Sequence, residues 1–150
     1  MLLKAYKQEH HRSIIQKGID AATAELGSNS KATVQVVVDH ILCCFAGEIL
    51  KLIPGRVSVE VDARLSFDTT ASVEKGRRLV GLLSKLGYGK ERVLVKLAAT
   101  WEGGEAARVL QSEGINCNMT LIFSLTQAVE CAKAGVKLIS PFVGSILDWH

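Results

Sequence analysis

A lysine inside an apolar run is the residue in this sequence best suited to covalent chemistry. In the run 93–99, Lys96 is the one side chain that is not apolar. Such runs are typical of strands in a parallel sheet that is buried on both faces. An ammonium group is costly there unless it is paired or loses its proton. A neutral lysine is a nucleophile able to form a Schiff base, whereas a lysine at a strand end extends its ammonium to solvent, and the run alone favours neither.

Polar residues on the neighbouring predicted strands favour the reactive lysine. Side chains alternate between the two faces of a strand, so each of four predicted strands has one apolar face and one partly polar face. The polar faces together carry Glu60, Lys96, Asn118, Thr120 and Ser140. Any one of these residues is more often structural than catalytic, but several around one lysine indicate an active site. On the third strand the apolar face is expected to hold Cys117, Met119 and Leu121.

The elements that must position these residues alternate between strand and helix. Two helices come first, over 1–26 and 34–52, although residues 34–38 also fit a strand. The strands expected after them are 57–61, 93–98, 115–121 and 136–143, and the helices between these are 72–86, 105–113 and 125–134. A glycine follows or closes each of these three helices, and Ser124 and Gln127 have the spacing of a capping box. This alternation predicts βαβ units and a parallel sheet.

The position of the polar residues separates two parallel architectures. A doubly wound sheet needs apolar residues on both faces, whereas a barrel builds its active site at the carboxyl ends of its strands. We therefore expect an α/β fold that is part of a (β/α)8 barrel, with about four parallel strands and flanking helices. A complete barrel takes about 250 residues, and the chain has 150. The expected organisation is one incomplete barrel domain over residues 1–150.

Composition and charge exclude several classes of protein. Hydrophobic residues make up 48% of the chain and charged residues 22%, as in an ordinary globular protein. The net charge of +3 comes from scattered basic residues, so no nucleic-acid partner is expected. No apolar stretch reaches the roughly 18 residues of a membrane span, and the first residues lack a signal core. The four cysteines form no C-x-x-C pair, which favours free thiols and a cytoplasmic location, and no metal site is expected.

Several stretches of the sequence resemble the transaldolase family, Schiff-base enzymes built on a (β/α)8 barrel. The resembling stretches are residues 49–58, 60–66, 95–101, 114–120, 139–144 and 146–149. They are long and follow one another in order from Ile49 to Trp149, so they are more specific than a short motif. The region before Ile49 resembles the family more loosely.

The resemblance implies catalytic roles for three residues. Lys96 corresponds to the lysine that forms an imine with the ketone of the substrate. Glu60 and Thr120 correspond to the pair that holds a catalytic water for proton transfer. No cofactor is implied, because the protonated imine is itself the electron sink.

The resemblance also implies substrate contacts and shows departures from the family pattern. Asn118 and Ser140 correspond to residues that hydrogen-bond the three-carbon intermediate, and Phe142 to an aromatic wall beside it. Ser145 stands where the family has a phosphate-binding arginine. The family's catalytic aspartate and its Thr-Thr-Asn-Pro stretch, on the first and second strands, have no counterpart in the chain. The four predicted strands correspond to the third to sixth strands of the family barrel.

The resemblance implies a transferase of the non-oxidative pentose phosphate pathway. It would move a dihydroxyacetone unit between sugar phosphates, pairing sedoheptulose 7-phosphate and glyceraldehyde 3-phosphate with erythrose 4-phosphate and fructose 6-phosphate. One alternative is a catalytically inactive fragment or interaction piece that forms a homo-oligomer through exposed strand edges, with Lys96 open to water. Another is a related Schiff-base aldolase, although the stretches 60–64 and 116–120 favour a transaldolase.

Overall fold

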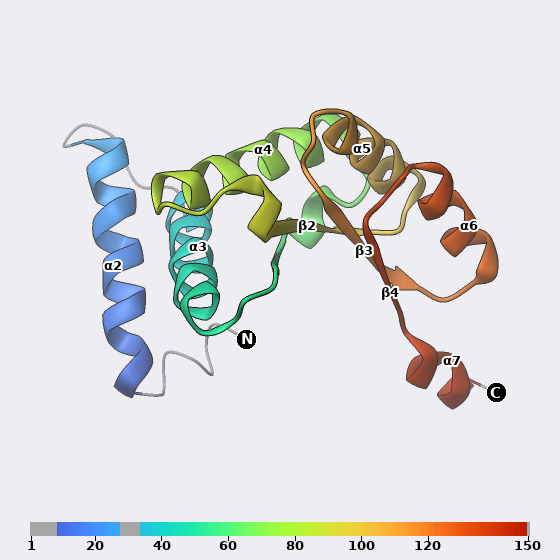
Figure 1. The fold of residues 1–150 in the computed structure, drawn as a ribbon, viewed down its shortest axis with the longest axis horizontal. Helices are drawn as coiled ribbons and strands as arrows, with labels where there is room; N and C mark the ends of the chain where they lie inside the picture. The colour runs from blue at the N-terminus through green and yellow to red at the C-terminus, as the bar shows by residue number, and fades with distance from the viewer. Residues whose placement is uncertain (1–8, 28–33, 150) are drawn as a thin grey trace. The chain divides into compact units, whose positions relative to one another are not determined.

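The computed structural model describes residues 9–27 and 34–149 of the chain (Figure 1). By its internal contacts the chain divides into two compact units, Met1–Pro54 and Gly55–His150. Within the described residues, no helix is both long enough and apolar enough to cross a membrane.

The first unit is a pair of helices, α2 (Glu9–Leu26) and α3 (Val34–Leu52). They lie in close contact at Gly18, where an added Cβ would lie 2.7 Å from the Cα atom of Ile41. The pair is also joined by His40 and Glu25, whose Nε2 and Oε2 atoms are 2.8 Å apart. Both predicted helices are confirmed where they are described, and the strand alternative for residues 34–38 is wrong. Residues 1–8 of the first prediction lie outside the described residues.

The second unit contains a sheet of four parallel strands in the order β1-β2-β3-β4. The strands are β1 (Val57–Glu60), β2 (Val93–Ala98), β3 (Cys117–Ile122) and β4 (Leu138–Pro141). The helices are α4 (Thr69–Lys85), α5 (Trp101–Ser112), α6 (Leu125–Lys133) and α7 (Val143–Trp149), with short 3-10 turns at Ala63–Leu65 and Lys90–Arg92. This architecture confirms the expected α/β fold, a part of a (β/α)8 barrel with flanking helices.

The core of the second unit lies between the sheet and helices α4 and α5. Apolar side chains from both layers are completely buried there, among them Val59, Val95, Met119, Leu79 and Leu110. In β1 the valines are buried and the residues between them exposed, as the alternating pattern predicts. The polar residues of the strands therefore lie on the opposite face of the sheet.

Two helices begin earlier than their apolar periodicity indicates, because polar caps precede them. Asp68 accepts a hydrogen bond from the Ala71 amide and starts α4, and Thr100 accepts one from the Gly103 amide and starts α5. The ends of these helices agree with the prediction. Gly87, Gly114 and Gly135 follow α4, α5 and α6 with φ of 89°, 73° and 74°, the left-handed geometry that glycine adopts easily.

The carboxyl ends of the last two strands differ from the prediction. Leu121 has φ of 59° and forms a bulge between Thr120 and Ile122, so its side chain is 40% exposed and its predicted place on the apolar face is wrong. Ile122 takes the buried position instead. The predicted strand 136–143 is also too long. It ends at Pro141, although the Phe142 amide still donates to the Ile122 carbonyl, and Val143 begins α7.

The four cysteines are free thiols, as predicted. Cys43, Cys117 and Cys131 are buried, and Cys44 is partly so. Burial raises the pKa of the Cys117 thiol to about 12. Because the thiolate is the reactive form, we expect this group to be inert at neutral pH.

Candidate active site

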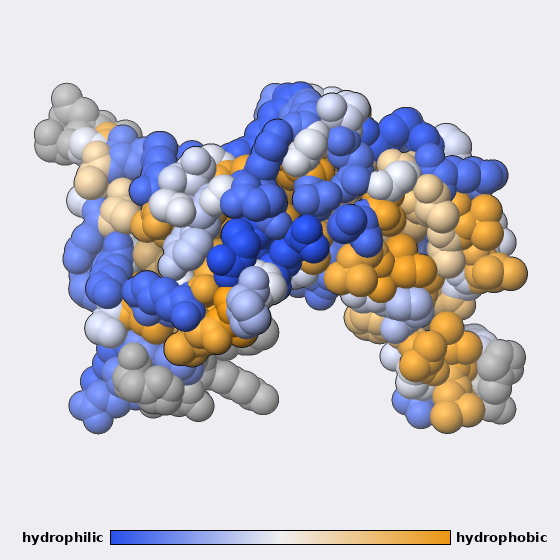
Figure 2. Space-filling view, in the orientation of Figure 1, coloured by the Kyte–Doolittle hydropathy of each residue, from blue (hydrophilic) through white to orange (hydrophobic). Residues whose placement is uncertain are grey.

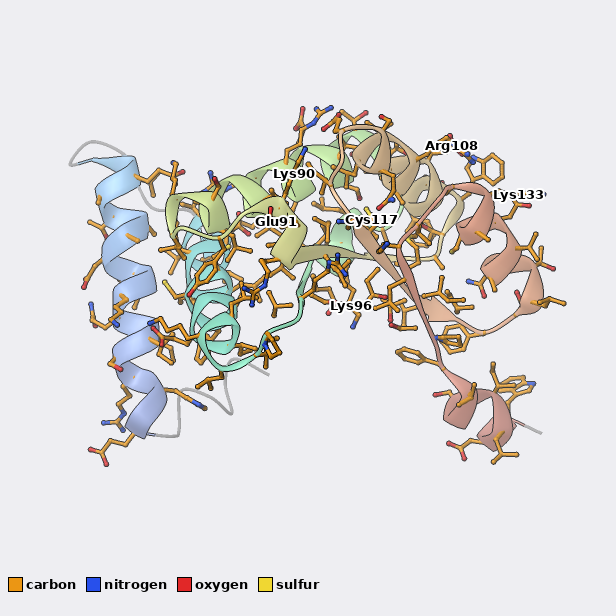
Figure 3. The ribbon with its side chains drawn as sticks, viewed as in Figure 1. Lys90, Glu91, Lys96, Arg108, Cys117 and Lys133 are labelled. Atoms are coloured by element: carbon orange, nitrogen blue, oxygen red, sulfur yellow. The ribbon has the colours of Figure 1, made fainter. Side chains whose placement is uncertain are left out.

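The register of the sheet sets Lys96 between two polar residues on adjacent strands. Lys96 pairs with Glu60 of β1 on one side and with Asn118 of β3 on the other. Thr120 pairs with Ser140 of β4 in a second row, two residues closer to the carboxyl ends of the strands. Because side chains alternate along a strand, all five lie on the face away from α4 and α5. Figure 3 shows the Lys96 side chain on that side of β2.

Lys96 and Glu60 form a loose ion pair on this face. The Lys96 Nζ atom lies 3.7 Å from Oε2 of Glu60, and the two side chains are 28% and 58% exposed. Lys96 is therefore neither fully buried nor isolated, so the cost expected for an unpaired buried ammonium does not arise. The lysine therefore has a carboxylate beside it that can exchange protons with it or with a bound water.

Asn118 is buried and joins strands through its side-chain amide. Its Nδ2 atom donates a hydrogen bond to Ser58 Oγ at 3.1 Å, and its Oδ1 atom accepts one from Ser140 Oγ at 2.9 Å. The amide thus links β1 to β4 through two serine hydroxyls. Ser58 was not among the predicted site residues, although it shares the exposed face of β1 with Glu60.

Thr120 carries a buried hydroxyl that the described residues leave without a hydrogen-bond partner. Its side chain is 2% exposed, and no described group bonds its Oγ1 atom. An unpartnered buried hydroxyl costs stability and is rare in native proteins, so such groups point to a bound water or ligand. The position next to Ser140 fits a group that holds a water in the site.

Phe142 and Ser145 lie beyond the end of β4. The Phe142 ring packs edge-to-face on Phe123, with ring centroids 5.4 Å apart and an angle of 71° between the rings. Ser145, on α7, lines a hollow of about 470 Å³ together with Phe123, Ile146 and Trp149. Hydrophobic side chains gather on the surface over β4 and α7 in Figure 2. Glu60, Lys96 and Asn118, which pair across adjacent strands, do not line this hollow.

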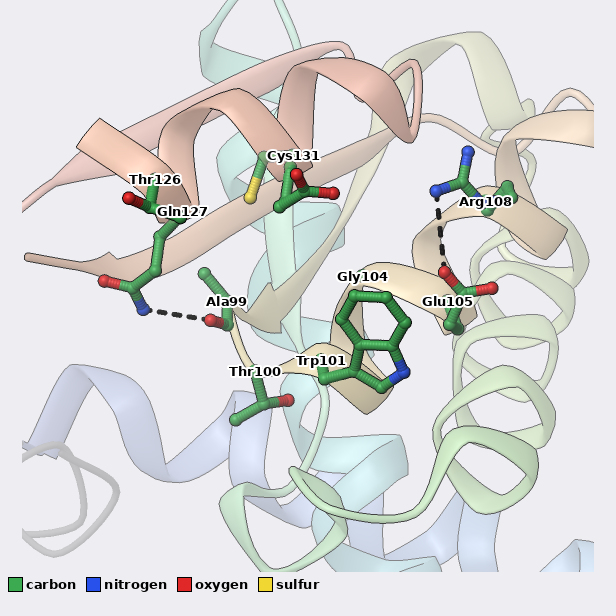
Figure 4. Close-up of a pocket in the computed structure, with 10 residues that line it drawn as sticks. Ala99, Thr100, Trp101, Gly104, Glu105, Arg108, Thr126, Gln127 and Cys131 are labelled. Atoms are coloured by element: carbon green, nitrogen blue, oxygen red, sulfur yellow. Dashed lines mark hydrogen bonds and ion pairs between the residues drawn. The ribbon is translucent and has the colours of Figure 1, made fainter. Parts of the chain in front are cut away.

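A second hollow, of about 160 Å³, lies between α5 and α6 beyond the carboxyl end of β2 (Figure 4). Gln127 lines it and donates a hydrogen bond from Nε2 to the Ala99 carbonyl at 2.9 Å. The sequence indicated Gln127 only as a capping residue. Its partner Ser124 does cap α6 by accepting a bond from the Gln127 amide, but the Gln127 side chain reaches beyond the helix.

This arrangement is suited to carbonyl chemistry on a polyhydroxylated substrate. A lysine amine can attack a ketone, a neighbouring carboxylate can carry protons, and amide and hydroxyl groups can bind sugar hydroxyls. Parallel strands with such groups on the inner face are the construction of (β/α)8 barrel enzymes.

A family model described as transaldolase/fructose-6-phosphate aldolase matches residues 3–150. The chain therefore belongs to the transaldolase/fructose-6-phosphate aldolase family, and the resemblance found in the sequence is confirmed at this level. Its class of activity is that of aldolases and transaldolases.

Proposed function

We propose that the chain is a transaldolase-type transferase whose Lys96 forms a Schiff base with the ketone of a sugar phosphate. The observation that supports this most directly is the row Glu60, Lys96 and Asn118 on adjacent parallel strands. The substrates are those that the resemblance implies, fructose 6-phosphate or sedoheptulose 7-phosphate as donor and an aldose phosphate as acceptor.

In the proposed reaction, the Lys96 amine adds to the C2 carbonyl carbon and the resulting carbinolamine loses water to give an iminium ion. The C3–C4 bond then breaks as the C4 hydroxyl loses its proton, and the bonding electrons pass into the iminium to leave an enamine. An aldose phosphate departs. The enamine carbon attacks the aldehyde of the acceptor, and hydrolysis of the new iminium frees Lys96.

The other residues of the site handle protons and hydroxyl groups. Glu60 and a water at Thr120 carry the protons of imine formation and hydrolysis. Asn118 and Ser140 bind hydroxyls of the three-carbon unit. The resemblance assigns the proton of the C4 hydroxyl to an aspartate on the family's first strand.

Trapping with borohydride tests the role of Lys96. We expect reduction in the presence of fructose 6-phosphate to leave a three-carbon adduct on the peptide that contains Lys96. Lys96→Arg should abolish the adduct, whereas Lys90→Arg, which changes a lysine bonded to the Glu113 carbonyl, should not. A six-carbon adduct would mean that the imine forms without cleavage, and an adduct on another lysine in an active preparation would refute the assignment.

The acceptor separates transferase from aldolase. We expect the three-carbon unit to appear on added erythrose 4-phosphate as sedoheptulose 7-phosphate rather than as free dihydroxyacetone. Release of free dihydroxyacetone alone would assign the chain to the aldolase branch of its family.

A non-catalytic role is the second candidate, favoured by the edge strand β4. Its Leu138 and Ile139 side chains are exposed although they are large and apolar, and exposed apolar edges pair readily with other chains. We propose that homo-oligomers form through this edge in the cytoplasm. Leu138→Lys should then reduce association in sedimentation velocity, and unchanged association would exclude the edge.

A further inference from the structure

The side chain of Gln127 holds three backbone groups at the carboxyl ends of β2 and β3. Its Nε2 atom donates to the Ala99 carbonyl at 2.9 Å and to the Leu121 carbonyl at 3.1 Å. Its Oε1 atom accepts from the Phe123 amide at 2.9 Å. Figure 4 shows the amide of Gln127 directed at Ala99. Both N–H donors of this amide thus bond main-chain carbonyls rather than water.

One of the groups held belongs to a residue in a strained conformation. Leu121 is the only residue other than glycine with positive φ in the part of the chain that the structure describes. A side chain at Cβ disfavours this left-handed region, so it persists only where the surroundings fix it. Gln127 bonds Leu121 itself and, two residues on, Phe123. It therefore fixes the bulge that Leu121 forms.

The hydrogen bonds close a ring that contains Thr120. The Thr120 carbonyl accepts a bond from the Ala99 amide at 2.8 Å, and the Ala99 carbonyl accepts one from Gln127. Gln127 then bonds Leu121, which follows Thr120 directly. The Thr120 hydroxyl, buried and without a partner among the described residues, is carried by the main chain of this ring.

We propose that Gln127 is a positioning residue that keeps the Thr120 hydroxyl on the face of the sheet that holds Lys96. It does this from outside the site, by holding Leu121 in the left-handed conformation and Ala99 against β3. This inference rests on the proposed function only in giving Thr120 a role in the reaction. The geometry that it describes stands by itself.

Gln111 provides a matched control at the other end of β3. Its side-chain amide also bridges main-chain groups, donating to the Gly135 carbonyl at 2.7 Å and accepting from the Cys117 amide at 2.7 Å. Gln111→Ala and Gln127→Ala both remove backbone bonds from the ends of β3, so both should lower stability. Only Gln127→Ala should change the position of the Thr120 side chain.

The direct readout is the methyl resonance of Thr120 in the 150-residue chain, assigned by its loss in Thr120→Val. We expect Gln127→Ala to shift it and Gln111→Ala to leave it in place. Leu121→Gly in the Gln127→Ala background should return the resonance toward its original position, because glycine adopts positive φ without a Cβ clash. If circular dichroism shows that Gln127→Ala does not fold, the same measurement is made on Gln127→Glu. Glutamate keeps the side-chain oxygen that accepts from the Phe123 amide and loses both N–H donors. An unmoved Thr120 resonance, or an equal shift in Gln111→Ala, overturns the proposal.

The second readout is the rate of adduct formation at Lys96 under borohydride. A displaced catalytic group costs a factor of about 10² in rate, so we expect a loss of that order in Gln127→Ala and less than a twofold change in Gln111→Ala. Equal losses in both variants would overturn the positioning role. If the unaltered chain forms no adduct at Lys96, the proposed function fails, and the Thr120 resonance alone decides on Gln127.

Discussion

The buried hydroxyl of Thr120 makes no hydrogen bond within the described residues that would stabilise the fold. Leaving such a group unsatisfied costs about 1–3 kcal/mol. Groups that lower stability in this way are expected at functional sites, where they are retained for what they do to a ligand.

Thr120→Val separates stability from function at this position. Valine keeps the shape of the side chain and removes a hydroxyl that no described group bonds, so we expect the free energy of unfolding not to fall and to rise by up to about 1 kcal/mol. We also expect adduct formation at Lys96 to slow by about 10²-fold, because the water for proton transfer loses its partner. Urea unfolding followed by circular dichroism measures the first effect, and borohydride trapping measures the second.

Ser72 offers the opposite case as a control. Its hydroxyl is equally buried, but it donates to the Leu65 carbonyl at 2.8 Å. Ser72→Ala should therefore lower the free energy of unfolding by about 1 kcal/mol, because the Leu65 carbonyl then keeps only its bond from the Asp68 amide. A loss of stability in Thr120→Val as large as that in Ser72→Ala would show that the threonine hydroxyl has a structural partner after all.

By the resemblance to the family, Ser145 presents a single neutral hydroxyl where the family pattern has an arginine. A guanidinium can hold two phosphate oxygens, and a charge-assisted contact of this kind is worth about 1.5–3 kcal/mol. In a protein that supplies all eight strands, we expect Ser145→Arg to lower the KM for phosphorylated substrates by roughly tenfold to a hundredfold. Steady-state kinetics with fructose 6-phosphate and with unphosphorylated dihydroxyacetone as donors measures the effect. Equal changes for both donors would place Ser145 away from the phosphate.

Among the elements, helix α5 is attached to β2 through a glycine that no larger residue can replace. A Cβ added to Gly103 would lie 2.1 Å from the Ala98 carbonyl oxygen, which is backbone and cannot turn away. The next residue, Gly104, has nothing within 4 Å of the same added atom. Two adjacent glycines of one helix thus have opposite environments.

This difference predicts opposite effects of the same substitution. Gly103→Ala should lower the free energy of unfolding by several kcal/mol, because α5 must move off β2. Gly104→Ala should raise it by about 0.4–1 kcal/mol, because alanine restricts the unfolded chain and favours the helix. Urea denaturation of the two variants side by side tests both. Destabilisation of equal size in both would mean that helix entropy, and not contact with Ala98, governs this turn.

The strands and helices of the chain were largely predictable, because their apolar periodicity is strong. Strand β2 was predicted to the residue, and the bounds of α3 also agree. Where the predicted elements differ from the structure, the cause is local. Asp68 and Thr100 start their helices through hydrogen bonds that apolar periodicity does not record, and Leu121 adopts a conformation that period-two alternation cannot represent.

The candidate site was predictable in part for the same reason. Alternation along the strands puts Glu60, Lys96 and Asn118 on one face, and the register then makes them neighbours. Gln127 could not be assigned its role from the sequence, because the role arises from bonds to the main chain of Ala99 and Leu121, which any residue type supplies. The roles of all these residues in catalysis remain predictions.

At the scale of the whole molecule, the described sheet has four strands with β1 and β4 at its edges. A closed barrel has eight, and closure is what surrounds the inner face with protein. Here Glu60 is more exposed than buried, and the ammonium of Lys96 is within reach of water. Enzymes exclude water from such sites because electrostatic and nucleophilic effects weaken in contact with it.

We therefore expect slow turnover from the 150-residue chain alone. The resemblance finds no counterpart of the family's catalytic aspartate, and loss of such an acid-base group costs a factor of about 10² to 10⁴. An open face adds to that loss. Against an ordinary turnover of about 10 per second, transfer from fructose 6-phosphate to erythrose 4-phosphate should fall at least about 10²-fold lower. An assay of sedoheptulose 7-phosphate formation, with Lys96→Arg as the blank, measures the rate. Turnover near that of an ordinary enzyme would mean that the chain builds a closed site, and sedimentation velocity would then show whether the remaining walls come from a second copy.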